Sequence, residues 1–400
     1  MEPSEALSFV IFFSGAFLMP LVAGRFHFTA AVGEILFGVA VGTAGLAWVQ
    51  PTAFTDTLAD LGFLFLMFLV GMEIDFNRIE KEGLWNISIA SLVAVSTLGV
   101  GAVLAWQLGL PFFIALVLGA MSVGIALVAL VEVGASQTRY GQILLLVGSI
   151  GEFLTLIALT AYNLIHLYGI SFHLLEEIGK ALFLFLVAYT VLAVLRLAVW
   201  WYPQRFQRWV DMDDPSEIGV RAGFMVMLSL AAVAGWVGLE AILGAFLAGA
   251  LFSFVFRDKG FLESKFSAVG QGFFIPLFFI NVGISFDAGA LGDLDTMLYL
   301  LAVLAVASLI AKLVPAFLLK FVGFTLRQVL SSAFLLAAPL TLLVAAQEMG
   351  HELGVLDDRM SSAIILLAIV SGVVFPTVFK LLTPSSRGEA SHGSKSVETM

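Results

Sequence analysis

The stretch RYGQILLLVGSIGEFLTLIALTAYNLIH, residues 139–166, carries one acidic side chain, Glu152, in an otherwise apolar run. About 20 such residues suffice for a helix to cross the hydrocarbon core of a bilayer. At a rise of 1.5 Å per residue, Glu152 lies about 20 Å from Arg139 and from His166, which is close to the middle of such a helix. An ionisable group at that depth is costly, and it therefore predicts a functional site.

The composition agrees with a membrane protein. The chain has 400 residues, 60% hydrophobic and 12% charged, whereas soluble proteins carry about 25% charged residues. It has no cysteine, which excludes disulfides and thiol chemistry. The segment Met1–Glu5 lacks a basic region, so the first apolar run is expected to be a mature helix, not a signal peptide. No phosphate loop, dinucleotide fingerprint or nucleophile elbow occurs in a suitable context. We therefore expect no enzyme activity, no cofactor and no nucleic-acid partner.

The chain divides into about 13 apolar runs of membrane-spanning length. Their spans are 6–24, 28–48, 54–72, 85–107, 111–131, 140–166, 178–200, 218–236, 239–256, 269–286, 296–320, 328–349 and 360–381. The sequence predicts one all-α polytopic membrane domain over residues 1–382. Residues 383–400 are polar and rich in serine and glycine, which predicts a disordered tail.

The distribution of basic residues predicts the orientation in the membrane. Cytoplasmic loops carry an excess of Lys and Arg. If the N-terminus lies outside, Lys180 and Arg359 fall in outer loops, Lys312 falls inside a run, and every other Lys and Arg falls on the inner side. We therefore expect the N-terminus outside and the C-terminus in the cytoplasm.

Two short segments predict an internal repeat. VGMEID at 70–75 ends the third run, and VGISFD at 282–287 ends the tenth. The second and ninth runs also correspond, and they begin near Glu34 and Glu240, which we expect to cap these helices or to pair at helix interfaces. Because seven helices separate the two copies, the halves must have opposite orientations. Inverted repeats are typical of secondary transporters.

Two runs at matching positions of the repeat are interrupted near their centres. The fifth run contains GAMSVG at 119–124, with Ser122 and Gly124, and the twelfth contains AAPLT at 337–341, with Pro339 and Thr341. Interrupted helices at corresponding positions of two halves indicate a transport site. Their free backbone groups bring partial charges to the middle of the membrane.

Three residues are the best candidates for binding ions or protons. Glu152 can take either a proton or a metal cation, and Ser149, one turn earlier, can add an oxygen ligand. Lys312 is predicted to pair with the site carboxylate when the cation is absent. Each residue also has an alternative interpretation without a role in transport. Glu152 would be a neutral structural glutamate, Ser149 would bond to its own helix, and Lys312 would extend to the inner surface.

Four segments together resemble the sodium/hydrogen exchanger domain of the second cation:proton antiporter family. They are VGEILFG (32–38), FLVGMEID (68–75), GAFLAG (244–249) and PLFFINVG (276–283). That family includes sodium/proton antiporters and glutathione-gated potassium efflux systems. The resemblance covers Met1 to about Leu382.

The resemblance implies a fold of 13 helices in two inverted repeats, with a dimerisation panel and a six-helix core in which the two interrupted helices cross. It also implies a homodimer in the cell membrane, such as a bacterial inner membrane. On this pattern the sixth helix carries an acidic pair, which reads Gly151-Glu152 here, and Lys312 matches the family's core lysine. The nucleotide-binding domain of the potassium efflux members is not expected.

The resemblance and the residues lead to one expected function and one rival. The expected function is one-for-one exchange of Na⁺ or K⁺ for H⁺, with Glu152 as the only carboxylate at the site. The rival, which the missing first acid of the pair suggests, is a channel-like or regulatory membrane protein on the same scaffold. The sequence does not distinguish between the two cations.

Overall fold

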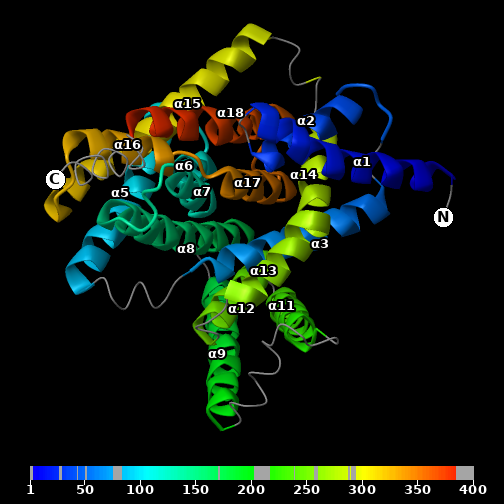
Figure 1. The fold of residues 1–400 in the computed structure, drawn as a ribbon, viewed down its shortest axis with the longest axis horizontal. Coiled ribbons are helices and arrows are strands. Elements are labelled where there is room, and N and C mark those ends of the chain that lie inside the picture. Colours follow the sequence, from blue (N-terminus) through cyan, green and yellow to red (C-terminus); the bar gives the residue numbers. More distant parts are fainter. Residues whose placement is uncertain are drawn as a thin grey trace, which may run out of the picture. The chain divides into compact units, whose positions relative to one another are not determined.

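The computed structural model describes residues 3–26, 29–42, 44–49, 52–74, 83–169, 172–201, 217–237, 239–255, 260–286, 289 and 294–383 (Figure 1). Within these ranges every regular element is a helix, as predicted. Three segments lie outside the described residues: residues 202–216, residues 75–82 with Arg78 and Lys81, and the predicted tail from Pro384 onward.

The chain forms two compact units. The first comprises Met1–Asn77 and Thr160–Phe286, and the second comprises Arg78–Leu159 and Asp287–Met400. The helix α8 (Arg139–Tyr168) continues from the second unit into the first. The first unit also holds α1 (Pro3–Phe26), α2 (Ala30–Val41), α3 (Ala53–Met72), α9 (Phe172–Trp201), α11 (Ile218–Trp236), α12 (Ala241–Val255), α13 (Gly260–Val269), the π-helical turn η1 (Gly270–Phe274) and α14 (Ile275–Ile284). The second holds α5 (Gly83–Gln107), α6 (Phe112–Gly119), α7 (Gly124–Glu132), α15 (Leu294–Ala316), the 3-10 helix η3 (Phe317–Val322), α16 (Leu326–Leu336), α17 (Leu340–Glu352) and α18 (Asp358–Leu382).

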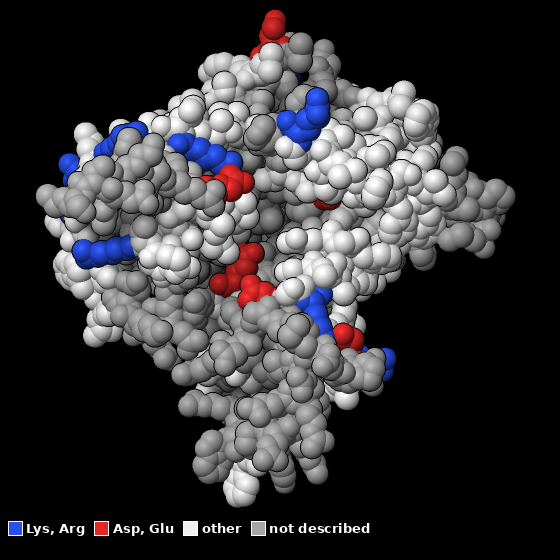
Figure 2. Space-filling model, viewed as in Figure 1, with Lys and Arg blue, Asp and Glu red and all other residues white. Residues whose placement is uncertain are grey.

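These helices account for every predicted apolar run, although several are shorter than predicted. Among the described residues, eight helices are long and apolar enough to cross a membrane, and α16 with α17 makes a ninth if the bent pair is one span. The remaining runs coincide with four shorter apolar helices: Phe9–Arg25, Ala30–Val41, Leu182–Val191 and Ala241–Val255. Figure 2 shows few charged side chains among the described residues of the face drawn. Large apolar side chains are exposed, for example Trp106 on α5, which suits helices that face lipid.

Glycines hold two helix pairs of the first unit close together. A Cβ on Gly38 of α2 would collide with the backbone of Ile280 and Gly283 on α14, and one on Gly283 would collide with Gly38 in return. In the same way, Gly71 of α3 and Gly249 of α12 each approach the other helix's backbone. In the predicted repeat α2 corresponds to α12 and α3 to α14, so the two pairs are equivalent. This packing supports the repeat and places Gly38 at a close helix contact.

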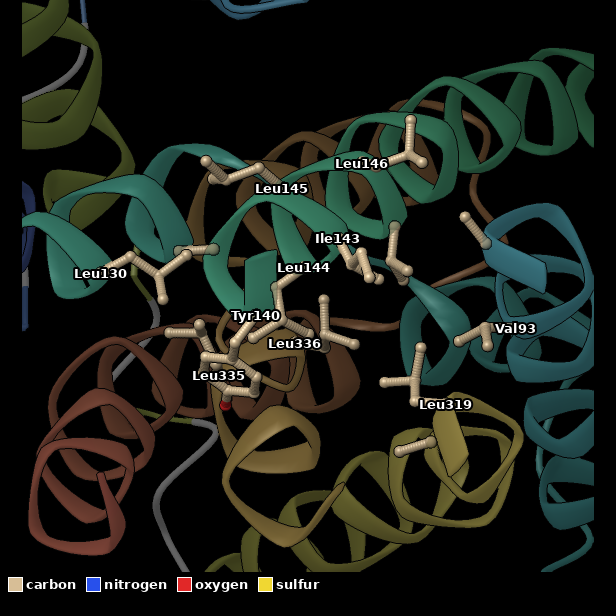
Figure 3. Close-up of a cluster of buried hydrophobic side chains, with 14 of the residues drawn as sticks. Val93, Leu130, Tyr140, Ile143, Leu144, Leu145, Leu146, Leu319, Leu335 and Leu336 are labelled. Carbon is tan, nitrogen blue, oxygen red and sulfur yellow. The ribbon is translucent and has the colours of Figure 1, made fainter. Parts of the chain in front are cut away.

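The core of the second unit surrounds the first half of α8. Figure 3 shows Tyr140, Ile143 and Leu144 of α8 directed toward side chains of α5, α7, η3 and α16. Tyr140 also shares a hydrogen bond of 2.7 Å with Ser331 of α16, since its buried hydroxyl needs a polar partner. This cluster fixes α8 against the helices that carry the candidate site.

Candidate functional site

Both predicted interruptions are present in the second unit. The helix α6 ends at Gly119, and α7 begins at Gly124 after a non-helical segment in which Ala120 is extended, with φ −56° and ψ 135°. The helices α16 and α17 meet at Ala337–Pro339 with a bend of 41°. Pro339 has no N–H to donate and disfavours a helical conformation of the preceding residue. Because α6 packs against α17 and α7 packs against α16, the two interrupted helices cross.

Glu152 lies at the interruption between α6 and α7. Its side chain is only 1% exposed. The hydroxyl of Ser122 donates a hydrogen bond of 2.8 Å to one carboxylate oxygen, and the backbone N–H of Val123 donates one of 3.2 Å to the other. Val123 caps the start of α7, where the helix dipole favours a negative charge. Within the described residues Glu152 forms no ion pair, so its charge is balanced only by these dipoles.

Thr341 of α17 joins the same group of polar atoms. Its hydroxyl oxygen lies 3.3 Å from that of Ser122. A serine hydroxyl has one hydrogen, and Ser122 gives this hydrogen to Glu152. Thr341 must therefore be the donor in the contact with Ser122. The structure thus brings together Glu152, Ser122 and Thr341 from three elements of the second unit, and their oxygens are ligands that hard cations prefer.

Ser149, Gly124 and Pro339 take no part in the hydrogen bonds around Glu152. Ser149 is buried on α8, one turn before Glu152, and its hydroxyl forms no hydrogen bond with the described residues, so it is not bonded to its own helix. Gly124 and Pro339 shape the two interruptions and bring no side-chain ligand. The roles of all these residues in binding remain proposals.

Lys312 has partners other than Glu152 in this structure. It is fully buried, so it does not extend to the inner surface. Its ammonium donates to the carbonyl oxygen of Leu118 at 2.5 Å and to the hydroxyl of Ser308 at 3.0 Å. Leu118 belongs to the last turn of α6, where free carbonyls favour a cation. In this structure Lys312 therefore binds the end of α6 and does not pair with Glu152.

Gly151, which stands where the resemblance expects the first acid, lies against Met121. A Cβ at Gly151 would collide with the side chain of Met121, which is fully buried. A side chain at residue 151 would therefore require Met121 to move. Sequence reasoning missed Met121, the N–H of Val123 and the carbonyl of Leu118, because backbone groups and packing partners carry no signal in the sequence.

These features define a polytopic helical membrane protein in which two interrupted helices cross beside a buried carboxylate. The chain belongs to the family described as the transmembrane sodium/hydrogen exchanger, whose model matches residues 13–383. The likeness to glutathione-gated potassium efflux systems remains a prediction.

Known proteins similar to this chain agree with that family. The "Putative Na(+)/H(+) antiporter YjbQ" of Bacillus subtilis is 32% identical over 406 aligned residues, which cover 96% of this chain and 64% of YjbQ. The chain thus spans somewhat less than two thirds of that relative. The "Na(+)/H(+) antiporter" of Enterococcus hirae is 24% identical over 90% of this chain and 94% of its own length. The structure of the sodium proton antiporter MjNhaP1 from Methanocaldococcus jannaschii matches with a TM-score of 0.62 at 11% identity, over 95% of this chain and 97% of that one, which shows the shared fold.

Proposed function

We propose that the protein is a secondary-active antiporter that exchanges Na⁺ or K⁺ for H⁺. Glu152 carries the proposal, because it is a buried carboxylate at crossed interruptions with two hydrogen-bond donors and, within the part of the chain that the structure describes, no basic partner. Such a group is costly as a bare charge inside a membrane. It is therefore expected to change exposure between the two sides only with a proton or a cation bound, and this requirement couples the two fluxes. The names of the relatives support the proposal, since they are called Na⁺/H⁺ antiporters.

The exchange is proposed to be electroneutral. Among the described residues Glu152 is the carboxylate that contacts the interruption between α6 and α7, and residue 151 beside it is a glycine that packs against Met121. One carboxylate neutralised by one proton or one monovalent cation gives exchange of one for one. Ser122, Thr341 and Ser149 are proposed as oxygen ligands of the cation. Lys312 is assigned to the stabilisation of α6 and not to charge transfer.

The setting is proposed from the sequence. The predicted excess of basic residues on one side of the membrane supports an N-terminus outside and a C-terminus in the cytoplasm. A homodimer in the cell membrane is proposed from the family.

The test is an exchange assay in proteoliposomes. A pH gradient is imposed, Li⁺, Na⁺, K⁺ or Rb⁺ is added across a range of pH values, and the collapse of the gradient is followed. The wild type is expected to respond to Na⁺ or K⁺ equally with and without a clamped membrane potential. Glu152→Gln is expected to give no response and Glu152→Asp a weaker one. Exchange by Glu152→Gln at the wild-type rate would overturn the assignment.

The second candidate is a channel-like or regulatory protein on the same scaffold. The observation in its favour is the apolar contact of Gly151 with Met121, since the acidic pair of the family is incomplete here. This candidate predicts that no monovalent cation collapses the pH gradient at any pH, even though the reconstituted protein is folded.

A further inference from the structure

A second polar pair lies within the first unit, at the far end of α8. The side-chain amide of Asn163 donates a hydrogen bond of 2.5 Å to a carboxylate oxygen of Glu240. Glu240 directly precedes α12. Apolar side chains of α8, α9, α11 and α12 form a buried cluster in the same region, including Leu164, Leu239 and Leu243. Glu240 is thus an acidic group at the edge of an apolar cluster.

Two groups of this pair are incompletely satisfied: the amide oxygen of Asn163 has no hydrogen-bond donor, and the carboxylate of Glu240 has no positive charge beside it among the described residues. Asn163 is only 4% exposed, and its amide oxygen is buried without a hydrogen-bond partner. Asn163 is also the single side-chain partner of Glu240 among the described residues, where Glu240 forms no ion pair. A buried amide oxygen without a partner is unfavourable. A carbonyl oxygen without a donor, next to a carboxylate without an ion pair among the described residues, is a combination that a bound positive charge would satisfy.

We propose that Asn163 and Glu240 form a second binding site for a monovalent cation of the kind that the protein exchanges. The nature of this cation rests on the proposed function, whereas the site itself does not. Oxygen ligands suit hard cations, and the single carboxylate matches a single charge. Among the described residues no group of three His, Cys, Asp or Glu side chains could hold a metal ion, so the ligand set typical of a transition metal is not found there.

A proton competes for the same site. If Glu240 is protonated, its O–H can donate to the amide oxygen of Asn163 while the amide of Asn163 donates to Glu240. This arrangement satisfies both groups without a cation. Cation binding at this pair is therefore expected to weaken as the pH falls.

The test measures binding of radioactive Na⁺ to purified protein in detergent, with choline to keep the ionic strength constant. It is repeated with radioactive Rb⁺, which serves as a substitute for K⁺. Glu152→Gln removes the first site, so any saturable binding that remains reports the second. Glu152→Gln is expected to retain binding. The double variant Glu152→Gln/Glu240→Gln is expected to bind the cation at least tenfold more weakly than Glu152→Gln alone. The double variant Glu152→Gln/Asn163→Leu is expected to show the same loss, although leucine has nearly the shape of asparagine. Asp295→Asn, which changes an exposed carboxylate in the first turn of α15, is the matched control and is expected to change nothing.

The outcomes separate this inference from the proposed function. If Glu152→Gln abolishes all binding that the wild type shows, there is no second site, and the role of Glu152 still stands. If Glu152→Gln binds like the wild type and Glu240→Gln alone removes the binding, the second site stands and the assignment of Glu152 fails. If the Glu240→Gln and Asn163→Leu variants both keep full affinity, the pair only joins α8 to α12, and the inference is wrong.

Discussion

The hydroxyls of Ser122 and Thr341 lie 3.3 Å apart and join the two interrupted helices of the second unit. The direction of this hydrogen bond depends on Glu152. While Glu152 is charged, Ser122 donates to it and Thr341 donates to Ser122. A protonated Glu152 can donate to Ser122, and Ser122 can then donate to Thr341. Protonation of Glu152 would therefore reverse the hydrogen bond that reaches Thr341 on α17.

Replacement of Thr341 by valine is expected to weaken cation affinity. Valine keeps the shape of the side chain and removes the hydroxyl that donates to Ser122. A loss of about 1.4 kcal/mol corresponds to a roughly tenfold increase in the apparent KM for the cation. The measurement is exchange in proteoliposomes against cation concentration. Thr97→Val is the matched control, because the buried hydroxyl of Thr97 bonds only to its own helix at Val93. Equal KM values for the two variants would contradict the role of Thr341.

Replacement of Ser122 by alanine is expected to change the pH dependence of exchange. Ser122 donates to the charged form of Glu152, and its removal favours the neutral, protonated form. A hydrogen bond to a charged group contributes about 1.5–3 kcal/mol, so half-maximal exchange is expected to move about one pH unit or more to the alkaline side. Ser371→Ala, which removes a buried hydroxyl bonded to its own helix, is expected to leave the profile in place. A shift to the acid side would exclude this role of Ser122.

The parts of the site that could be predicted from sequence are those with a local signal. Glu152 is visible because a charge within an apolar run is rare, and Pro339 and the glycines at 119–124 are visible because they weaken helices. The helical spans follow from apolar length alone. Their ends were less predictable, since α2 and α12 are shorter than the apolar runs that contain them.

The parts that could not be predicted depend on contacts between distant segments. Lys312 was expected to pair with a carboxylate, because opposite charges in a membrane are expected to attract each other. In the structure the free carbonyl of Leu118 satisfies its ammonium instead. The sequence does not predict that Asn163 is buried against Glu240, since an asparagine near a helix end is usually exposed. Its contact with Glu240 appears only when α8 and α12 are packed together.

Replacement of Lys312 by methionine is expected to reduce stability while the stoichiometry of exchange remains one for one. Methionine fills a similar volume but leaves the buried carbonyl of Leu118 without its donor, which costs about 1–3 kcal/mol. The measurements are the midpoint of thermal unfolding in detergent and the charge moved per proton in proteoliposomes. Lys320→Met, which changes an exposed lysine in η3, is the control. If Lys312→Met changes the cation affinity and leaves stability intact, the lysine acts on Glu152 during transport after all.

The contact between Gly151 and Met121 predicts a destabilisation that depends on the side chain at residue 121. A Cβ at residue 151 would overlap the side chain of Met121, and added volume in a packed core costs about 1–3 kcal/mol. Gly151→Ala is therefore expected to lower the midpoint of thermal unfolding of the wild type, and to lower that of Met121→Ala much less. Gly99→Ala is the control, because a Cβ on Gly99 meets no atom within 4 Å. If the losses of the two single variants simply add in the double variant, the two residues do not share this space. A smaller loss from Gly151→Ala in the Met121→Ala background would show that Met121, and not the backbone of α8, keeps residue 151 small.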